Sequence, residues 1–175
     1  MKTRRHPATV LLFVLPVLLL LGAVVLAVGA GRDARPEPST GPLALPPVEA
    51  PDAGAPACTA LLAALPAALP VSQGVADRLP LAAPAPAGAQ AWAPGGDRRQ
   101  PVVLRCGLPR PAELTPTSQL IVINGVSWLN LSEPDRDTFI AVDRAVYLAL
   151  TVPRALGTGP VQTVSDTVRT ALPPR

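Results

Sequence analysis

The residue types that perform most enzyme chemistry are scarce in this chain. Its one histidine, His6, and its one lysine, Lys2, both precede a long apolar run near the N-terminus. Nucleophilic serine or cysteine usually needs such a base, and zinc sites usually need histidine or several cysteines. The sequence contains no GxSxG motif and no phosphate-binding glycine loop. We therefore expect the chain after the apolar run not to be an enzyme, and we expect no cofactor and no metal.

Cys58 and Cys106 are the only cysteines, 48 residues apart. In an oxidising compartment two such cysteines usually pair. A reactive thiol or a metal site is the alternative, but there is no CxxC spacing and no histidine nearby. We predict a structural disulfide, which would stabilise the fold by about 4 kcal/mol on a chain-entropy estimate.

Three carboxylates alternate in one predicted loop, at Glu133, Asp135 and Asp137. Carboxylate oxygens are the ligands that Ca²⁺ prefers. The segment lacks the glycine and the terminal glutamate of a calcium-binding loop, so we expect a solvated acidic turn.

Arg105, Arg144 and Trp128 are the candidate ligand-binding residues. Each arginine interrupts an apolar run of β type, where a charge needs a partner. A salt bridge or an exposed strand face would explain them, and so would a bound anion. In a regular strand Asp143 would point away from Arg144, so we do not expect these two to pair. Trp128 fits either a core position or a stacking platform for a sugar.

The first 30 residues predict export. Lys2, Arg4 and Arg5 precede 23 uncharged residues, 8–30, which as a helix would span roughly 34 Å, enough for a bilayer core. Positive residues stay in the cytoplasm, so residues 1–7 are predicted cytoplasmic and residues 8–30 a single transmembrane helix at the cell membrane. The alternative is a signal peptide, with secretion after cleavage near Ala30.

The rest of the chain divides by composition. There are 24 prolines in 175 residues, and residues 31–56 predict a Pro/Ala-rich disordered linker. Residues 57–173 predict one extracytoplasmic domain. From residue 57 onward ten arginines are interspersed with eight acidic residues, without a basic stripe, so we expect no nucleic-acid partner.

The periodicities predict an α+β domain. A short helix should start near Cys58, with its leucines on one face, and end near Ala64 before Pro66. An amphipathic helix should start at Pro160 and stop at Pro173.

Between these helices we expect four or five mostly antiparallel strands. Asn124-Gly125 lies between two β-rich runs and predicts a hairpin with a type I′ turn. The predicted strands are residues 101–106, 119–123, 126–130, 138–142 and 145–152, the last two being separate strands or one long bent strand.

The order of several motifs resembles a family of unknown function, domain-of-unknown-function family 3515 of high-GC Gram-positive bacteria. The similar residues are Cys58 with Leu61-Leu62-Ala63-Ala64-Leu65-Pro66, Val103-Leu104-Arg105-Cys106-Gly107, Val122-Ile123-Asn124-Gly125-Val126-Ser127-Trp128, Asp143-Arg144, and Val152-Pro153. The resemblance covers residues 58–173 and implies an exported or membrane-anchored envelope protein, with no catalytic residues to assign. Residues 95–99 lengthen a loop relative to the family pattern, so we expect no shared function there.

Two hypotheses for function follow. The first is a non-catalytic envelope protein, anchored in the membrane, whose domain binds another envelope component such as a protein. The alternative is an extracytoplasmic domain that binds a small ligand or a glycan. A pocket lined by Arg105, Arg144 or Trp128 would favour the alternative, and a flat apolar patch would favour a protein partner.

Overall fold

The computed structural model describes residues 41–175. The predicted cytoplasmic segment 1–7, the transmembrane or signal segment 8–30 and the first part of the predicted linker, 31–40, lie outside the described residues. Within residues 41–175, no helix is long and apolar enough to cross a membrane.

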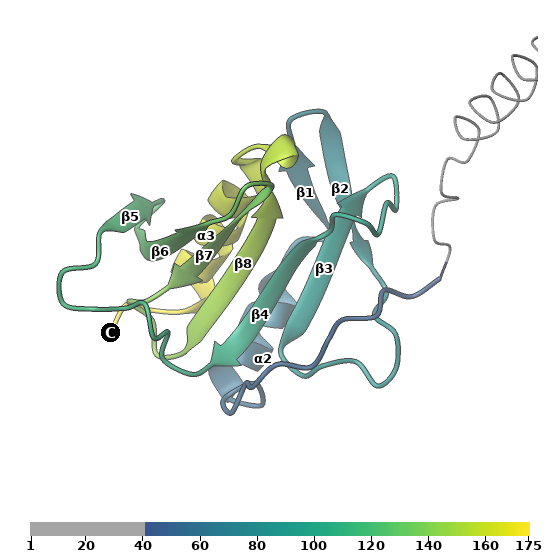
Figure 1. The fold of residues 1–175 in the computed structure, drawn as a ribbon. Helices are drawn as coiled ribbons and strands as arrows, with labels where there is room; N and C mark the ends of the chain where they lie inside the picture. Colours follow the sequence, from purple (N-terminus) through teal and green to yellow (C-terminus); the bar gives the residue numbers. More distant parts are fainter. Residues whose placement is uncertain (1–40) are drawn as a thin grey trace, which may run out of the picture. The chain divides into compact units, whose positions relative to one another are not determined.

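Eight strands form one curled antiparallel sheet in the order β1-β2-β3-β4-β8-β7-β6-β5 (Figure 1). The α+β class and the antiparallel pairing are confirmed, but the predicted four or five strands were too few. The strands are β1 (Ala68–Val71), β2 (Gly74–Leu79), β3 (Ala89–Pro94), β4 (Val102–Leu108), β5 (Leu120–Ile123), β6 (Val126–Ser132), β7 (Arg136–Ala141) and β8 (Tyr147–Pro153).

The two α-helices of the described residues cover the same face of the sheet, here called the inner face (Figure 1). Helix α2 (Pro56–Ala64) ends where predicted, because Pro66 leaves Leu65 in an extended conformation. Helix α3 (Gly159–Ala171) follows a short 3₁₀ turn, η1 (Arg154–Leu156), and carries Pro160 in its first turn. The two predicted helices are therefore confirmed.

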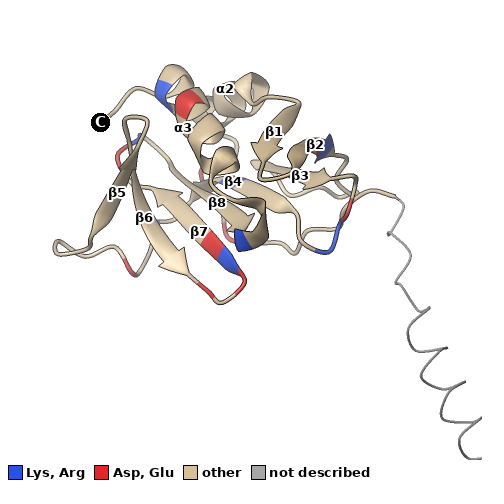
Figure 2. Cartoon of the chain, turned by 90° about the horizontal axis from the view of Figure 1, so that it is seen from above, with Lys and Arg blue, Asp and Glu red and all other residues tan. Residues whose placement is uncertain are grey.

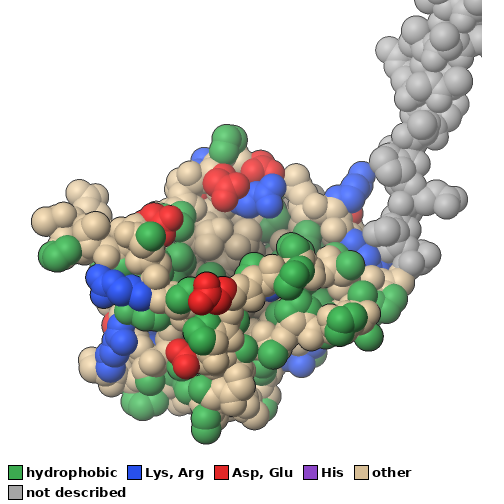
Figure 3. Space-filling model, turned by 60° about the horizontal axis from the view of Figure 1, so that its bottom comes forward, with side chains coloured by type: hydrophobic (Ala, Val, Ile, Leu, Met, Phe, Trp, Pro, Cys, Tyr) green, Lys and Arg blue, Asp and Glu red, His purple; other side chains and the backbone are tan. Residues whose placement is uncertain are grey.

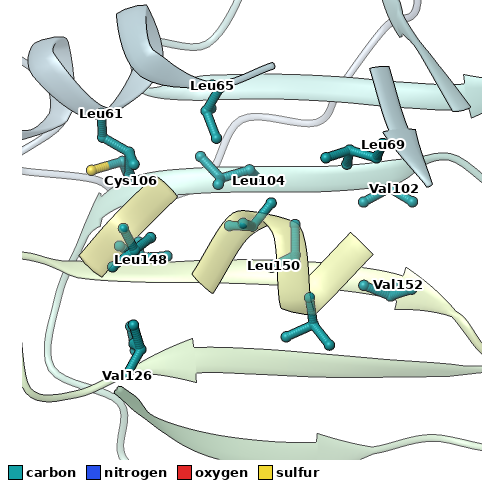
Figure 4. Close-up of a cluster of buried hydrophobic side chains, with 14 of the residues drawn as sticks. Leu61, Leu65, Leu69, Val102, Leu104, Cys106, Val126, Leu148, Leu150 and Val152 are labelled. Carbon is teal, nitrogen blue, oxygen red and sulfur yellow. The ribbon is translucent and has the colours of Figure 1, made fainter. Parts of the chain in front are cut away.

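The core lies between the helices and the inner face (Figure 4). Because side chains alternate along a strand, Val102, Leu104 and Cys106 of β4 point into this core while Val103 and Arg105 point to the outer face. Apart from two tryptophans, Trp92 and Trp128, the core is aliphatic: its labelled members in Figure 4 are Leu61, Leu65, Leu69, Val102, Leu104, Cys106, Val126, Leu148, Leu150 and Val152.

The predicted hairpin is present. Strands β5 and β6 pair with Ile123 opposite Val126, and the two turn residues have φ of +49° at Asn124 and +80° at Gly125. Positive φ at both positions is what a type I′ turn requires, and the Asn-Gly sequence adopts it readily.

Of the two possibilities left open for residues 138–152, the structure has separate strands, β7 and β8, which pair with each other. The structure differs from the sequence predictions in the proline- and alanine-rich regions. Residues 43–53, predicted as part of a disordered linker, pack on the sheet, and the Ala/Pro-rich segment after Pro66 supplies β1, β2 and β3. Residues 43–53 and the segment of β1 to β3 are ordered for the same physical reason. Isolated leucines and a tryptophan among their prolines and alanines are buried.

Candidate functional site

A proline-rich segment, residues 43–53, crosses the outer face of β3 and β4 and is here called the strap (Figure 1). Backbone hydrogen bonds join Leu43 to Pro80 and to Ala82, each at 2.8 Å. The side chains of Leu43 and Leu45 pack on apolar residues of the outer face. Those residues are Leu79, Leu81, Ala91, Ala93 and Val103.

The far end of the strap is held by Gly107 on β4. The Asp52 N–H donates to the Gly107 carbonyl at 3.0 Å. Gly107 has φ of +84°, and a Cβ there would lie 2.2 Å from the backbone nitrogen of Ala53. Only glycine allows both this conformation and this approach of the two backbones.

Arg105 lies under the strap on the same strand. Its Nη2 donates to the Pro46 carbonyl at 2.8 Å, and burial lowers the pKa of its guanidinium. Within residues 41–175 no carboxylate forms an ion pair with it. A half-buried cation without a counter-ion attracts an anion, because a single hydrogen bond to a neutral carbonyl offsets only part of its desolvation.

Two cavities meet at Arg105. The first, of about 550 Å³, lies between the strap and the loop of residues 82–87, and Arg105 is the one charged residue that lines it. Its other lining residues are Ala44, Leu45, Pro47, Val48, Ala50, Ala53, Ala82, Ala83, Pro84, Ala85, Pro86 and Ala87. It is therefore an apolar groove with a single positive group.

The second cavity, of about 320 Å³, lies on the other side of the strap, and Arg99, Arg105 and Arg136 line it together with Asp135. Two of these arginines are already paired. Arg99 lies 2.8 Å from Asp97, and Arg136 lies 3.0 Å from Asp135. The uncompensated charge of this cavity is therefore Arg105.

On the face seen in Figure 3, basic and acidic side chains are interspersed among apolar ones. Among the described residues, Arg78 and Arg110 also form no ion pair with a carboxylate. Arg105 is distinguished from them by its place, since neither Arg78 nor Arg110 lines either of the two cavities.

Arg144 is buried in a different place, with a side chain only 1% exposed. Its Nη1 lies 2.8 Å from Oδ1 of Asp143, and its Nη2 donates to the Gly125 carbonyl at 2.8 Å. The expectation that Asp143 would not pair with Arg144 was wrong. These residues lie in the connection between β7 and β8, where the alternation of a regular strand does not apply.

Trp128 is fully buried. Its Nε1 donates to Oγ of Ser165 on α3 at 3.0 Å, and its ring meets Phe139 edge to face with the centroids 6.4 Å apart. Neither Trp128 nor Arg144 lines either of the two cavities described above. Of the three candidate residues, the structure therefore puts only Arg105 at either of these cavities.

The two cysteines form a disulfide, and two carboxylates of the acidic turn form ion pairs. Cys58 of α2 and Cys106 of β4 form the predicted disulfide, with their Cα atoms 5.6 Å apart. Asp135 pairs with Arg136, and Asp137 pairs with Arg154 at 3.1 Å. Within the described residues, no three His, Cys, Asp or Glu side chains are grouped to hold a metal ion.

Residues 13–175 match the model of the family DUF3515, described as a protein of unknown function. The chain belongs to this family. The resemblance seen in the sequence is thereby confirmed over nearly the whole chain. No curated protein and no solved structure matched it.

Sequence reasoning missed most of what surrounds Arg105 in this DUF3515 chain. The strap, the loop of residues 82–87, and the arginines Arg99 and Arg136 were not expected near it. One signal was available: Leu43 and Leu45 are spaced by two, as in a strand with one buried face. That spacing favours a docked segment over a free spacer.

Proposed function

We propose that this chain is a non-catalytic, membrane-anchored envelope protein whose exported domain binds an anionic envelope component at Arg105. The observation that carries the proposal is the half-buried Arg105 guanidinium, which has no carboxylate partner and lies where two cavities meet. A pocket lined by Arg105 favours a small ligand over a protein at this surface.

The lining of the larger cavity suggests the chemistry of the ligand. Alanine, proline, leucine and valine offer contacts to an apolar body and few hydrogen bonds. A guanidinium has five N–H donors, and the contact with Pro46 uses one donor of Arg105. A carboxylate or phosphate on an apolar chain would satisfy the remaining donors while its body fills the groove.

The location rests on the N-terminal sequence. Lys2, Arg4 and Arg5 before the uncharged run of residues 8–30 support a retained anchor with the domain outside the cell. The Cys58–Cys106 disulfide agrees with an oxidising compartment. N-terminal sequencing of the mature protein distinguishes the two forms of export, because a chain that starts at Gly31 would exclude the anchor.

Ligand binding can be tested on the full chain in nanodiscs of zwitterionic lipid, by following the Nε–Hε signals of its arginines. We expect hexanoate and hexyl phosphate to shift the Arg105 signal, and neutral hexanol to leave it unchanged. Arg105→Gln should weaken binding about 10-fold to 100-fold, as expected for loss of a charge-assisted hydrogen bond.

Arg110→Gln is the matched control, since Arg110 is exposed and lines neither cavity. It should bind like the wild type. Equal affinity of Arg105→Gln and the wild type for both anions would refute the proposal.

A further inference from the structure

The edge of the sheet at β5 is apolar, and within residues 41–175 no other segment covers it. Leu120, Ile121 and Val122 are 43%, 46% and 69% exposed, and they are consecutive in the chain. Single exposed apolar residues are common on protein surfaces, but a whole apolar edge strand is not. Natural sheets usually protect such an edge with charge, proline or a covering segment.

The opposite edge, β1, has such protection. Pro70 lacks a backbone N–H, and Ser72 donates its own to Leu156 at 2.9 Å. Gly159 approaches so closely that a Cβ there would lie 2.5 Å from the Pro70 carbonyl oxygen. Strand β5 contains no proline, and within the described residues it pairs with β6 on one side and with no strand on the other.

The hairpin turn determines which backbone groups of β5 are free. In a two-residue hairpin the flanking residues, Ile123 and Val126, bond to each other, and the direction alternates from there. Ile121 and Ile123 therefore bond to β6. The N–H and carbonyl groups of Leu120 and Val122 face away from the sheet, ready for another strand.

We propose that β5 pairs antiparallel with β5 of a second copy of this chain, about a two-fold axis at Ile121. This register sets Leu120 of each copy opposite Val122 of the other, so that the four outward-facing backbone groups of one copy meet those of the other. Apolar side chains meet apolar side chains on both faces, which is the self-complementarity that a two-fold contact requires.

The charge pattern supports a second copy as the occupant. No charged residue occurs from Ser118 to Ser127, and β5 carries neither blue nor red in Figure 2. Two copies therefore meet along this edge without placing like charges opposite each other, which would oppose pairing. The contact extends the eight-stranded sheet across both molecules by β-strand addition.

The register allows a sharp cysteine test on the full chain in membranes. Ile121 would face Ile121 of the second copy in a non-hydrogen-bonded pair, with Cα atoms about 4.5 Å apart, within reach of a disulfide. We expect Ile121→Cys to give an oxidised dimer on a non-reducing gel. Leu120→Cys should give little, because equivalent residues would be diagonal neighbours about 7–8 Å apart.

Second substitutions test the edge itself. Val122→Lys added to Ile121→Cys should lower dimer formation at least fivefold. Each copy would then place one lysine opposite the apolar Leu120 of the other copy. Val75→Lys is the matched control, since Val75 is also an exposed valine but lies on β2; it should not change dimer formation.

Three results with this chain alone would overturn the proposal. They are no dimer of Ile121→Cys, equal dimer from Leu120→Cys, and a dimer that Val122→Lys leaves unchanged. A mixed disulfide with another protein and no homodimer would also overturn it, since it would show a different partner at β5. Circular dichroism of each variant verifies that the fold is intact.

Discussion

Breaking the Cys58–Cys106 disulfide should greatly reduce the stability of the folded domain. The bond joins helix α2 to β4, a central strand of the sheet, and both cysteines are fully buried. Reduction removes one covalent link and leaves the sequence unchanged. Its effect therefore measures how much the link stabilises the folded chain.

The expected size follows from the loop that the bond closes. For a separation of 48 residues, the chain-entropy relation gives about 14 cal/mol/K, or about 4 kcal/mol at 25 °C. Domains of this kind are stable by about 5–15 kcal/mol in total. The reduced protein should thus keep only part of its stability, or unfold.

Urea unfolding of the oxidised and reduced full chain, followed by tryptophan fluorescence, measures this difference. With a slope of about 2 kcal/mol per molar urea, the midpoint should fall by about 2 M on reduction. The slope should rise, because the reduced unfolded chain exposes more surface. Cys58→Ala with Cys106→Ala gives a second form without the bond and without reductant.

A fall in the free energy of unfolding of less than about 1 kcal/mol would refute this reasoning. Local undocking of α2 is the competing outcome, and two reporters distinguish it. Trp92 donates to the carbonyl of Pro66, just after α2, at 3.1 Å, whereas Trp128 contacts α3 through Ser165. Phe substitutions of each tryptophan should give coincident transitions if unfolding is global.

Three further predictions concern single sites. Arg144→Met should lower the free energy of unfolding by about 2–4 kcal/mol in urea, because Asp143, 27% exposed, loses its cation and the Gly125 carbonyl loses a charged donor. A change below about 1 kcal/mol would contradict the structural role. Gly107→Ala should displace the strap, because its Cβ would lie 2.2 Å from the Ala53 nitrogen, and faster hydrogen exchange at residues 43–53 would show this. Asp97 should titrate near pH 2 by NMR, since hydrogen bonds from the Arg99 side chain and backbone lower its pKa from 3.8 to about 2. The small stabilising effect of its ionised form is complete above pH 3.8 and is lost as the pH falls through 2. Arg99→Gln should raise the pKa of Asp97.

The elements that could be predicted from sequence were those with local signals. Helix α3 has apolar residues at helical spacing and prolines at both ends, and the β5–β6 hairpin has Asn124-Gly125 at its turn. In each case neighbours in the sequence decide the conformation. Tertiary packing then only reinforces a choice that the local chain already favours.

Strands β1, β2 and β3 could not be predicted in the same way. They contain small residues and prolines, which do not favour a strand locally. Their extended conformation depends on pairing with neighbouring strands. Arg78 lies opposite Trp92, for example, and Trp92 opposite Val102. Strand formation of this type depends on cross-strand packing rather than intrinsic preference.

The surroundings of Arg105 depend on contacts even more distant in sequence. Its hydrogen-bond acceptor, Pro46, is 59 residues away. The sequence shows a charge in an apolar strand and hence a need for a partner, but not which group meets it. The partner of Arg144, in contrast, is the adjacent residue Asp143. The sequence prediction excluded this pair because it assumed a regular strand, in which neighbouring side chains point to opposite faces.

Three successive residues of β4 connect the candidate site to the stability of the domain. Alternation directs Arg105 to the strap and Cys106 to α2, while Gly107 accepts the hydrogen bond from Asp52. The strap runs directly into the turn before α2, so the disulfide fixes one end of the same segment that covers Arg105. Reduction should therefore loosen the cavity walls as well as lower stability, and ligand affinity at Arg105 should fall on reduction even under conditions where the sheet remains folded.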